Sequence, residues 1–305
     1  MVLRATGIDM LPTFIPPLLN GAGLALLFGA PLLVIAWIMH RRRRQYREHA
    51  NDPFIDMPLR PPGESLRIKI EQLTERYDDW VSTGFLTAVL AAGLVSVAPH
   101  NEKVAVALGA IPAAAIFYLM MGRKMFRLQK QLWDYRLGFT AERATGEELN
   151  QLVAAGFKVF HDVPFDSYNV DHVIVGPPGV YAVETKGRRK PANIKGVAKA
   201  TVIFDGVSLA FPRYSERKSV EQARLNAHSL SKWLSKATGE QTTVSPILAL
   251  PGWWIDRRSR SDVNVLNPKE IITSFPSRIP SPLSPDRIGR ISHQLSERCR
   301  LAKPL

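Results

Sequence analysis

The sequence predicts a mixed α/β (α+β) protein in which apolar, membrane-length helices precede a soluble domain with a mixed central sheet flanked by helices. Two observations support this fold class. Long apolar runs are confined to the chain before Gly122, and strand-like and helix-like segments alternate irregularly after it. This irregularity, with the lack of a glycine fingerprint for phosphate binding, excludes a doubly wound nucleotide-binding fold.

The first apolar run, residues 18–39, is long enough to cross the hydrocarbon core of a bilayer as a helix. Its basic residues follow it, at Arg41 to Arg44, and no small-residue cleavage site is visible. We therefore expect a retained transmembrane anchor over residues 1–40 and not a cleaved signal peptide.

Two further apolar runs, residues 83–98 and 104–121, predict a transmembrane hairpin over residues 83–122. Each arm is near the lower length limit, so a buried helical hairpin of a soluble protein remains the alternative. No charged residue lies inside any of the three runs, which argues against a transporter or a proton pathway.

The distribution of basic residues sets the expected orientation, because positively charged loops stay on the cytosolic side. Basic residues follow the first run and the third, whereas the loop between the second and third runs carries only Lys103. We expect a multi-pass protein of the cell (inner) membrane, with its N-terminus outside and its C-terminal domain in the cytosol. Residues 41–82 would form a cytosolic linker with a helical segment, and residues 123–135 a basic juxtamembrane helix.

Charge and cysteine content narrow the partners and the compartment. A formal net charge of +13 favours polyanions, either nucleic acid or an anionic membrane surface, and charge alone does not choose between them. The single cysteine, Cys299, excludes an intrachain disulfide and a cysteine-rich zinc site. A reducing compartment and a structural or incidental role for Cys299 are the simplest interpretation.

After the third apolar run the pattern predicts a series of short elements. A helix over residues 140–155 ends at Gly156, the segment 176–179 marks a turn between two strands, and Asp205–Gly206 marks a second hairpin. The expected strands are residues 157–161, 170–175, 180–185, 201–204, 207–211, 244–250 and 263–266, and the further expected helices are residues 215–236 and 285–301.

Asp171, Glu184 and Lys186 form the constellation with the strongest chemical signal. Residues two apart in a strand face the same way, so Glu184 and Lys186 share one face, and a hairpin pairing brings Asp171 beside Glu184. Hard divalent cations prefer such oxygen ligands, and a nearby lysine can stabilise developing negative charge. Asp171 and Glu184 would bind the metal, with the Thr185 carbonyl as a further ligand and Lys186 as the positioning group.

The structural alternative is an edge hairpin with charges paired across its strands, which would contribute under about 1 kcal/mol. Spacing alone does not decide between these interpretations. The metal-site interpretation gains because the charges interrupt the apolar runs 173–175 and 180–183, where a purely structural hairpin would continue with Val or Ile.

The residues around this constellation, Asn169 to Pro177 and Gly179 to Lys186, resemble the core of the nuclease-related domain, a branch of the PD-(D/E)XK nuclease superfamily. Ala141 stands where the family usually has a glycine. The resemblance extends over further residues on both sides, which are Leu137, Gly138, Glu142, Arg143, Gln222, Ala223, Asn226 and Leu250 to Trp253.

This resemblance implies a restriction-endonuclease-like fold over residues 136–255, followed by a C-terminal extension over residues 256–305. It implies that Glu142 adds a carboxylate to the catalytic and metal-binding set. It also implies a position near the substrate for Gln222, for which a hydrogen bond on the helix surface is the alternative.

The sequence therefore predicts a membrane-anchored nuclease, a phosphodiester hydrolase that uses Mg²⁺ or Mn²⁺ and cuts cytosolic DNA or RNA, with DNA favoured. Its catalytic residues would be Glu142, Asp171, Glu184 and Lys186. The alternative is a non-catalytic nucleic-acid-binding or scaffold module at the membrane that retains the nuclease fold.

Other side chains have plausible but weaker functional interpretations. His161 and His172 could bind a metal, yet His172 alternates to the face opposite Asp171, so structural roles are favoured. Trp253 and Trp254 could stack on bases, although packing is the favoured role. Basic residues near the site could contact phosphates or be ordinary solvated charges, and they are Lys190, Lys195, Lys199, Arg213, Arg217 and Lys218.

Overall fold

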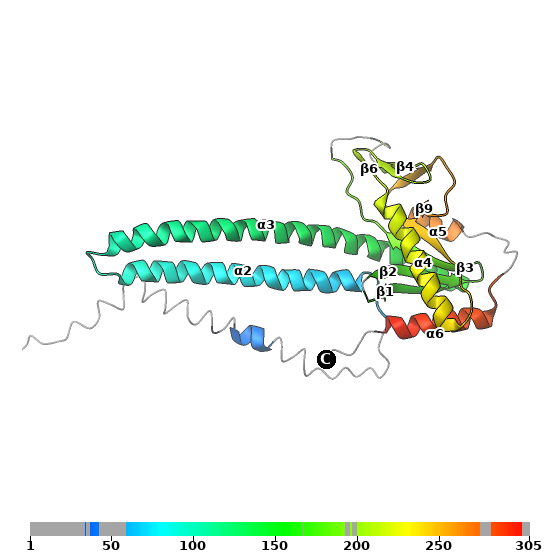
Figure 1. Cartoon of the computed structure of the whole chain (residues 1–305), viewed down its shortest axis with the longest axis horizontal. Helices are drawn as coiled ribbons and strands as arrows, with labels where there is room; N and C mark the ends of the chain where they lie inside the picture. Colours follow the sequence, from blue (N-terminus) through cyan, green and yellow to red (C-terminus); the bar gives the residue numbers. More distant parts are fainter. Residues whose placement is uncertain are drawn as a thin grey trace, which may run out of the picture. The chain divides into compact units, whose positions relative to one another are not determined.

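The computed structural model describes residues 34, 37–42, 59–166, 168–192, 196, 200–274 and 282–300 (Figure 1). The chain divides into two compact units. The helical unit comprises residues 1–53, 74–129 and 305, and the sheet unit comprises residues 54–73 and 130–304.

The helical unit contains most of α2 (Glu64–Val97) and the first part of α3 (Lys103–Asn150). These segments pack against each other, because the Tyr118 hydroxyl donates a hydrogen bond of 2.8 Å to the Gly84 carbonyl. The Lys124 ammonium lies 4.1 Å from the centroid of a Trp80 ring. The second and third apolar runs thus lie on two helices that pack against each other, while their relation to a membrane is a separate question.

Among the residues described, one helix, Lys103–Ala155, is long and apolar enough to cross a membrane, and none of its apolar window is buried. The prediction of three transmembrane helices is therefore not supported. The second run lies in α2, where its apolar part is shorter than the roughly 20 residues that a span requires. Most of the first run, residues 18–39, lies outside the described part of the chain.

The helix α3 differs from the sequence prediction of an exit helix followed by a separate helix from residue 140. It continues through Gly138 without a break and is followed by a short 3-10 helix, η1 (Gln151–Ala155). A Cβ added at Gly138 would lie 3.1 Å from a Leu66 methyl group, so this glycine serves close packing and does not end the helix. The chain leaves η1 at Gly156 with φ of 85°, as the glycine there predicts.

The sheet unit is built on a mixed five-stranded sheet with the order β1-β2-β3-β7-β9. The first three strands are antiparallel, and β7 and β9 continue the sheet in parallel. The mixed central sheet predicted from the sequence is thus confirmed. Its strands are β1 (Lys158–Pro164), β2 (Asn169–Gly176), β3 (Gly179–Thr185), β7 (Val244–Ala249) and β9 (Asn264–Leu266).

A second, four-stranded sheet has the order β6-β5-β4-β8. The predicted hairpin is present, but residues 205–208 form its loop in place of the expected tight Asp-Gly turn. Gly206 has a positive φ of 96°, and Asp205 Oδ1 accepts hydrogen bonds from the Val207 and Ser208 amides. Neither β6 nor β8 was predicted. The strand β6 occupies the start of the segment predicted as the helix 215–236, which begins instead at Lys218, and β8 is short and carries polar residues. The four strands are β4 (Thr201–Phe204), β5 (Leu209–Phe211), β6 (Tyr214–Glu216) and β8 (Trp254–Arg257).

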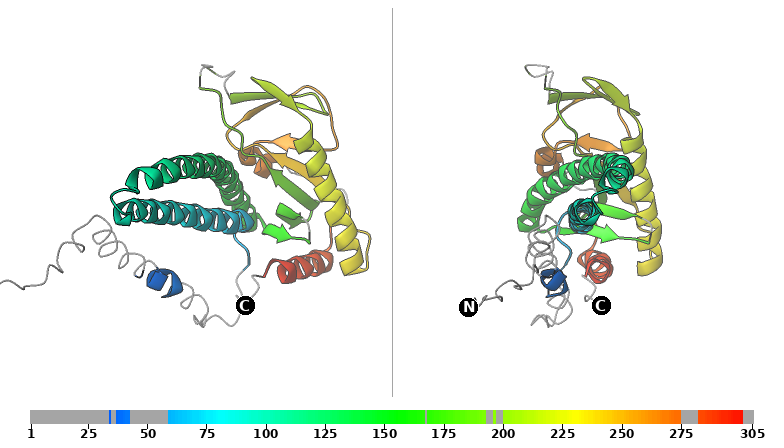
Figure 2. Two further views of the ribbon diagram at one scale, coloured as in Figure 1. Left: turned by 60° about the vertical axis from the view of Figure 1, so that its left-hand side comes forward. Right: turned by 90° about the vertical axis from the view of Figure 1, so that its left-hand side faces the viewer.

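Helices cover both faces of the five-stranded sheet (Figure 2). On one face α4 (Lys218–Thr238) and α6 (Pro285–Cys299) pack on Val173, Val175, Val180 and Ala182. On the other face the end of α3, η1 and α5 (Pro268–Ser274) pack on Ile174, Val183 and Ile247. The valines alternate between these cores as an extended strand requires.

Candidate functional site

The site lies where β2 begins and β3 ends. The antiparallel register pairs His172 with Val183, and continuing it by one residue sets Asp171 opposite Glu184. Both side chains are on the α4 face of the sheet, which agrees with the alternation predicted from the sequence. Two acidic groups therefore meet at the end of a buried hairpin, where an apolar pair would otherwise continue the core.

Asp171 is held by the backbone of the neighbouring strand. Its Oδ2 accepts a hydrogen bond of 2.7 Å from the Thr185 amide. Burial raises the pKa of the Asp171 carboxyl well above its usual range, and the negative charges of Glu184 and Glu142 raise it further. The ammonium of Lys186 and the Thr185 hydrogen bond oppose this rise only in part.

Glu184 has both carboxylate oxygens engaged, although its side chain is buried. Its Oε1 accepts from the Lys186 ammonium at 2.5 Å, and its Oε2 accepts from the Asn226 amide at 2.6 Å. Lys186 also donates a hydrogen bond of 3.1 Å to Gln222 Oε1. Gln222 thus lies beside Lys186, and the position near a substrate that the resemblance implied stays a prediction.

Asn226 is a site residue whose role the sequence analysis missed. It lies one helical turn after Gln222 on α4, so both amides reach the same end of β3. The i, i+4 spacing of two amide side chains on a helix next to the predicted site was the available signal.

Glu142 reaches the site from α3. It is buried, and burial raises its pKa to about 8, with Asp162 and Glu184 adding to the rise and Lys186 and Lys69 opposing it. The four predicted catalytic residues, Glu142, Asp171, Glu184 and Lys186, therefore interact electrostatically in one region.

Gly187 lets α3 approach the end of β3. A Cβ added at Gly187 would lie 3.0 Å from both the Ala141 Cβ and the Leu137 carbonyl oxygen. Ala141, which replaces the glycine expected before the family's glutamate, is accommodated because the opposing residue has no side chain. The helix turn that carries Glu142 is thereby seated directly against the residue that follows Lys186.

Asp162 is a further buried carboxylate, and the sequence did not mark it as a site residue. It has φ of 48°, in the left-handed region, and its Oδ2 accepts hydrogen bonds from Arg60 Nε at 2.8 Å and from the Ser65 amide at 2.9 Å. Asn169 donates to its other oxygen at 3.1 Å. These bonds join the start of α2 to β1 and β2, within the sheet unit.

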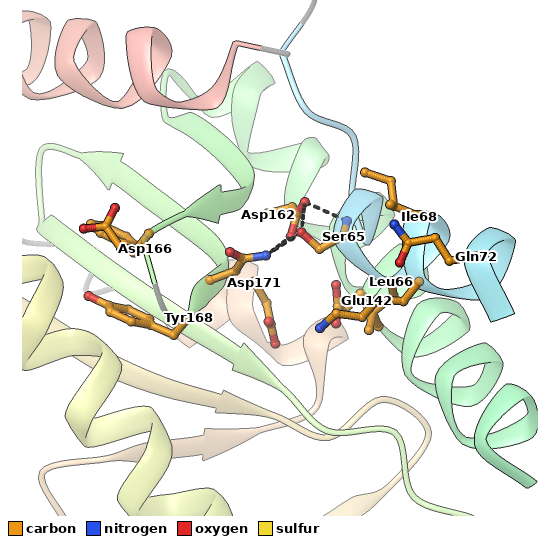
Figure 3. A pocket seen from close by; sticks show the side chains of 12 residues that line it. Ser65, Leu66, Ile68, Gln72, Glu142, Asp162, Asp166, Tyr168 and Asp171 are labelled. Carbon is orange, nitrogen blue, oxygen red and sulfur yellow. Dashed lines mark hydrogen bonds between the residues drawn. The ribbon is translucent and has the colours of Figure 1, made fainter. Parts of the chain in front are cut away.

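A cavity of about 500 Å³ opens beside these groups (Figure 3). The first two turns of α2 form one side, and the turn that joins β1 to β2 forms another. Glu142 and Asp171 line it, so it gives access to two of the predicted catalytic carboxylates. A ligand in this cavity would contact residues from both chain segments of the sheet unit, 54–73 and 130–304.

The donor set can be tested for its fit to a divalent cation. Within the described ranges, no group of three or more His, Cys, Asp or Glu side chains is arranged to hold a metal ion as it stands. Glu142, Asp171 and Glu184 nevertheless gather oxygen donors and excess negative charge, which Lys186 offsets only in part. Hard divalent cations bind such oxygen donors, so the chemistry of these residues suits a divalent cation.

The two histidines form a buried pair on the other face of the sheet. His161 Nδ1 lies 2.8 Å from His172 Nδ1, and His161 Nε2 lies 3.0 Å from Asn150 Oδ1. Burial lowers the pKa of His161 to about 4 and that of His172 well below its usual range. Both rings are therefore neutral. The His172 side chain lies on the face of the sheet opposite to that of Asp171, as predicted.

The remaining candidate residues, two tryptophans and six basic residues, are either packed in the core or exposed at the surface, apart from two that lie outside the described residues. Trp253 is buried and donates a hydrogen bond of 3.3 Å to the Arg188 carbonyl, whereas Trp254 is 66 % exposed. Four of the basic candidates are exposed, namely Lys190, Arg213, Arg217 and Lys218, and Lys195 and Lys199 lie outside the described residues.

Comparison with known families supports the resemblance inferred from the sequence. Residues 137–251 match the model of the nuclease-related domain. No curated protein and no solved structure matches the chain. The matched range contains Glu142, Asp171, Glu184, Lys186 and Gln222, so the whole predicted site lies within it.

Proposed function

We propose that this protein is a membrane-anchored, divalent-metal-dependent nuclease that hydrolyses phosphodiester bonds of DNA or RNA in the cytosol. One observation carries the proposal: the partly buried Lys186–Glu184 ion pair of 2.5 Å stands beside Asp171 and Glu142 within a region that matches the nuclease-related domain. A partly buried ammonium among carboxylates, next to an open cavity, can supply the metal binding and charge stabilisation that favour phosphodiester hydrolysis.

The contacts of each residue support a distinct role. The Lys186 ammonium would stabilise the charge that develops on a phosphate oxygen, and Gln222 and Glu184 orient it. Asn226 and the Thr185 amide fix the carboxylates of Glu184 and Asp171. A divalent cation bound by these carboxylates would polarise the phosphate and lower the pKa of a bound water. That the Thr185 carbonyl oxygen is a metal ligand stays a prediction.

Membrane attachment is supported by the apolar surface of the helical unit. Several large apolar side chains there are more than half exposed, which is unusual for a helix surrounded by water. A bilayer would cover them, and the basic residues that follow Met121 favour a cytosolic sheet unit. The exposed side chains are Phe85, Leu90, Val104, Leu108, Ile111, Ile116, Leu119 and Met120.

The test is hydrolysis by the purified full-length chain in detergent with Mg²⁺ or Mn²⁺. Lys186→Ala is expected to lower the cleavage rate by about 10²–10³-fold while nucleic-acid binding persists. Lys232→Ala removes an exposed lysine from α4 and serves as the matched control. Near-ultraviolet circular dichroism would verify that both variants are folded.

Equal cleavage by Lys186→Ala and the native chain would refute the assignment of this site. Nucleic-acid binding without hydrolysis under any divalent metal would favour the non-catalytic binding or scaffold module instead. Flotation with liposomes tests the membrane attachment separately. The full-length native chain is compared with a variant in which exposed apolar residues of the helical unit are replaced by polar ones.

A further inference from the structure

The cavity beside the carboxylates has a wall that is fixed in place. Its α2 side is tied to β1 through Asp162, which accepts from Arg60 and from both the amide and hydroxyl of Ser65, the latter two at 2.9 Å. These contacts are largely buried, so the wall is a permanent part of the sheet unit. A substrate must enter a cavity bounded on that side.

The opposite end of the cavity is aromatic. Phe165 and Tyr168 stack with ring centroids 4.8 Å apart and planes 6° from parallel. The Arg298 guanidinium carbon lies 4.3 Å from the Phe165 centroid, and the Trp233 ring meets Phe165 edge-on at 5.6 Å. Tyr168 is therefore held by a braced stack, and both stacked rings line the cavity.

The lining is mostly acidic, with the carboxylates of Glu142, Asp162, Asp166 and Asp171. Among the described residues that line the cavity, Lys69 is the one cation, and it is near enough to Glu142 to lower the pKa of that carboxyl. Gln72 lies one turn beyond Lys69 and adds amide donors and an acceptor. A ligand that suits the cavity has an anionic part for the Lys69 side and a flat ring for the Tyr168 side.

We propose that this cavity binds one unpaired nucleotide, with its base against Tyr168 and its phosphate near Lys69, so the site acts on single-stranded nucleic acid or unpaired strand ends. The inference rests on the proposed nuclease function and deepens it. A volume of about 500 Å³ suits a ligand of nucleotide size. A paired base would have to leave its duplex to enter, which costs a few kcal/mol, whereas an unpaired base meets a stacking surface directly.

The first experiment compares cleavage of one labelled sequence as a single strand and inside a duplex closed by loops at both ends, using the full-length chain. The single strand is expected to be cut at least about 10-fold faster, because unpairing costs a few kcal/mol. Tyr168→Ala is expected to raise KM for the single strand by about 5–100-fold, and Tyr168→Phe to retain native KM, since the ring provides the stacking.

Tyr214 provides the matched control. It stacks on Phe211 with centroids 4.9 Å apart and planes 21° from parallel, but it belongs to the four-stranded sheet and does not line the cavity. Tyr214→Ala should leave KM for the single strand unchanged. Equal loss in Tyr168→Ala and Tyr214→Ala, or duplex cleavage as fast as single-strand cleavage, would overturn the cavity proposal while the nuclease assignment stands.

Binding measured by fluorescence anisotropy distinguishes a failure of the cavity proposal from a failure of the nuclease proposal. With Ca²⁺ replacing Mg²⁺, the native chain should bind a normal single strand more tightly than one whose bases are replaced by abasic sites, and Tyr168→Ala should abolish that difference. If this pattern holds and no metal supports hydrolysis, the cavity proposal stands and the nuclease proposal fails. If Tyr168→Ala distinguishes the two strands as the native chain does, the cavity proposal is wrong.

Discussion

Asn226 donates a hydrogen bond of 2.6 Å to the Oε2 of Glu184, and this bond fixes the orientation of the central carboxylate of the site. Lys186 holds the other oxygen of Glu184 at 2.5 Å. One partner comes from α4 and the other from the residue just beyond β3, so the Glu184 carboxylate couples the helix to the sheet. This geometry makes Asn226 a positioning residue for the proposed reaction.

Replacement of Asn226 by alanine should therefore impair catalysis more than substrate binding. We expect Asn226→Ala to lower kcat by about 10-fold or more with a smaller change in KM, and to lower the free energy of unfolding by about 1–3 kcal/mol because a buried acceptor loses its donor. Steady-state cleavage and urea denaturation measure the two effects. Asn264→Ala, at an exposed position in β9, is the control. An unchanged kcat would contradict the positioning role.

Gly187 should tolerate no side chain. In Gly187→Ala the new Cβ would meet the Ala141 Cβ and the Leu137 carbonyl at 3.0 Å, and overpacking of this kind destabilises a protein by about 1–3 kcal/mol. Because Lys186 and Glu142 adjoin these residues, cleavage should fall too. Gly289→Ala is the matched control, because Gly289 is at an exposed position of α6 and its new Cβ would have no heavy atom within 4 Å. This substitution should stabilise the helix by up to about 1 kcal/mol. Equal melting temperatures for both variants would contradict the close approach.

The sequence predicted the part of the site that local periodicity determines. Alternation along two strands and one turn was sufficient to set Asp171 beside Glu184, because their separation in sequence is short and the hairpin register follows from the turn. Glu142 and Gln222 required the family resemblance, since they come from helices whose docking on the strand end is a tertiary property.

Long-range packing accounts for what the sequence did not reveal. Arg60 and Ser65 meet Asp162 across about a hundred residues of chain, and no local pattern reports such contacts. Arg60 and Ser65 lie in the predicted cytosolic linker, residues 41–82, which carries no functional motif. Its apolar positions do not form a single helical stripe either. The predicted strand ended at His161, whereas β1 continues through Asp162 to Pro164, and the positive φ of Asp162 could not be foreseen from an aspartate alone.

Stability without metal should fall as pH rises. Glu142 titrates at about 8 in the folded chain against an ordinary value of 4.5, so the folded form binds more protons than the unfolded form between these values. The free energy of unfolding must then decrease as pH increases from about 4.5 towards about 8. The raised pKa of Asp171 acts in the same direction.

Urea denaturation in the presence of a chelator, repeated across that pH range, measures this slope. Glu142→Gln should reduce it, since glutamine does not titrate. Adding Mg²⁺ should offset the loss at the upper end of the range, because a cation favours the ionised carboxylates. A slope in Glu142→Gln equal to that of the native chain would show that another group is responsible.

The ion pair between Arg60 and Asp162 should be among the costliest contacts of the sheet unit to break. Their side chains are 14 % and 3 % exposed, so Arg60→Ala leaves a buried carboxylate without its cation, and such losses cost about 3–5 kcal/mol. Arg143→Ala is the control, because the Arg143–Glu147 pair is 58 % and 70 % exposed and should contribute only about 0–1 kcal/mol. The double variant Arg60→Ala with Asp162→Asn should recover part of the loss. Asparagine tolerates the left-handed backbone, and it has no buried charge that would be left without a partner. Tryptophan fluorescence during urea unfolding follows all three variants, and a similar small cost for Arg60→Ala and Arg143→Ala would mean that the α2 wall of the cavity is not fixed by Asp162.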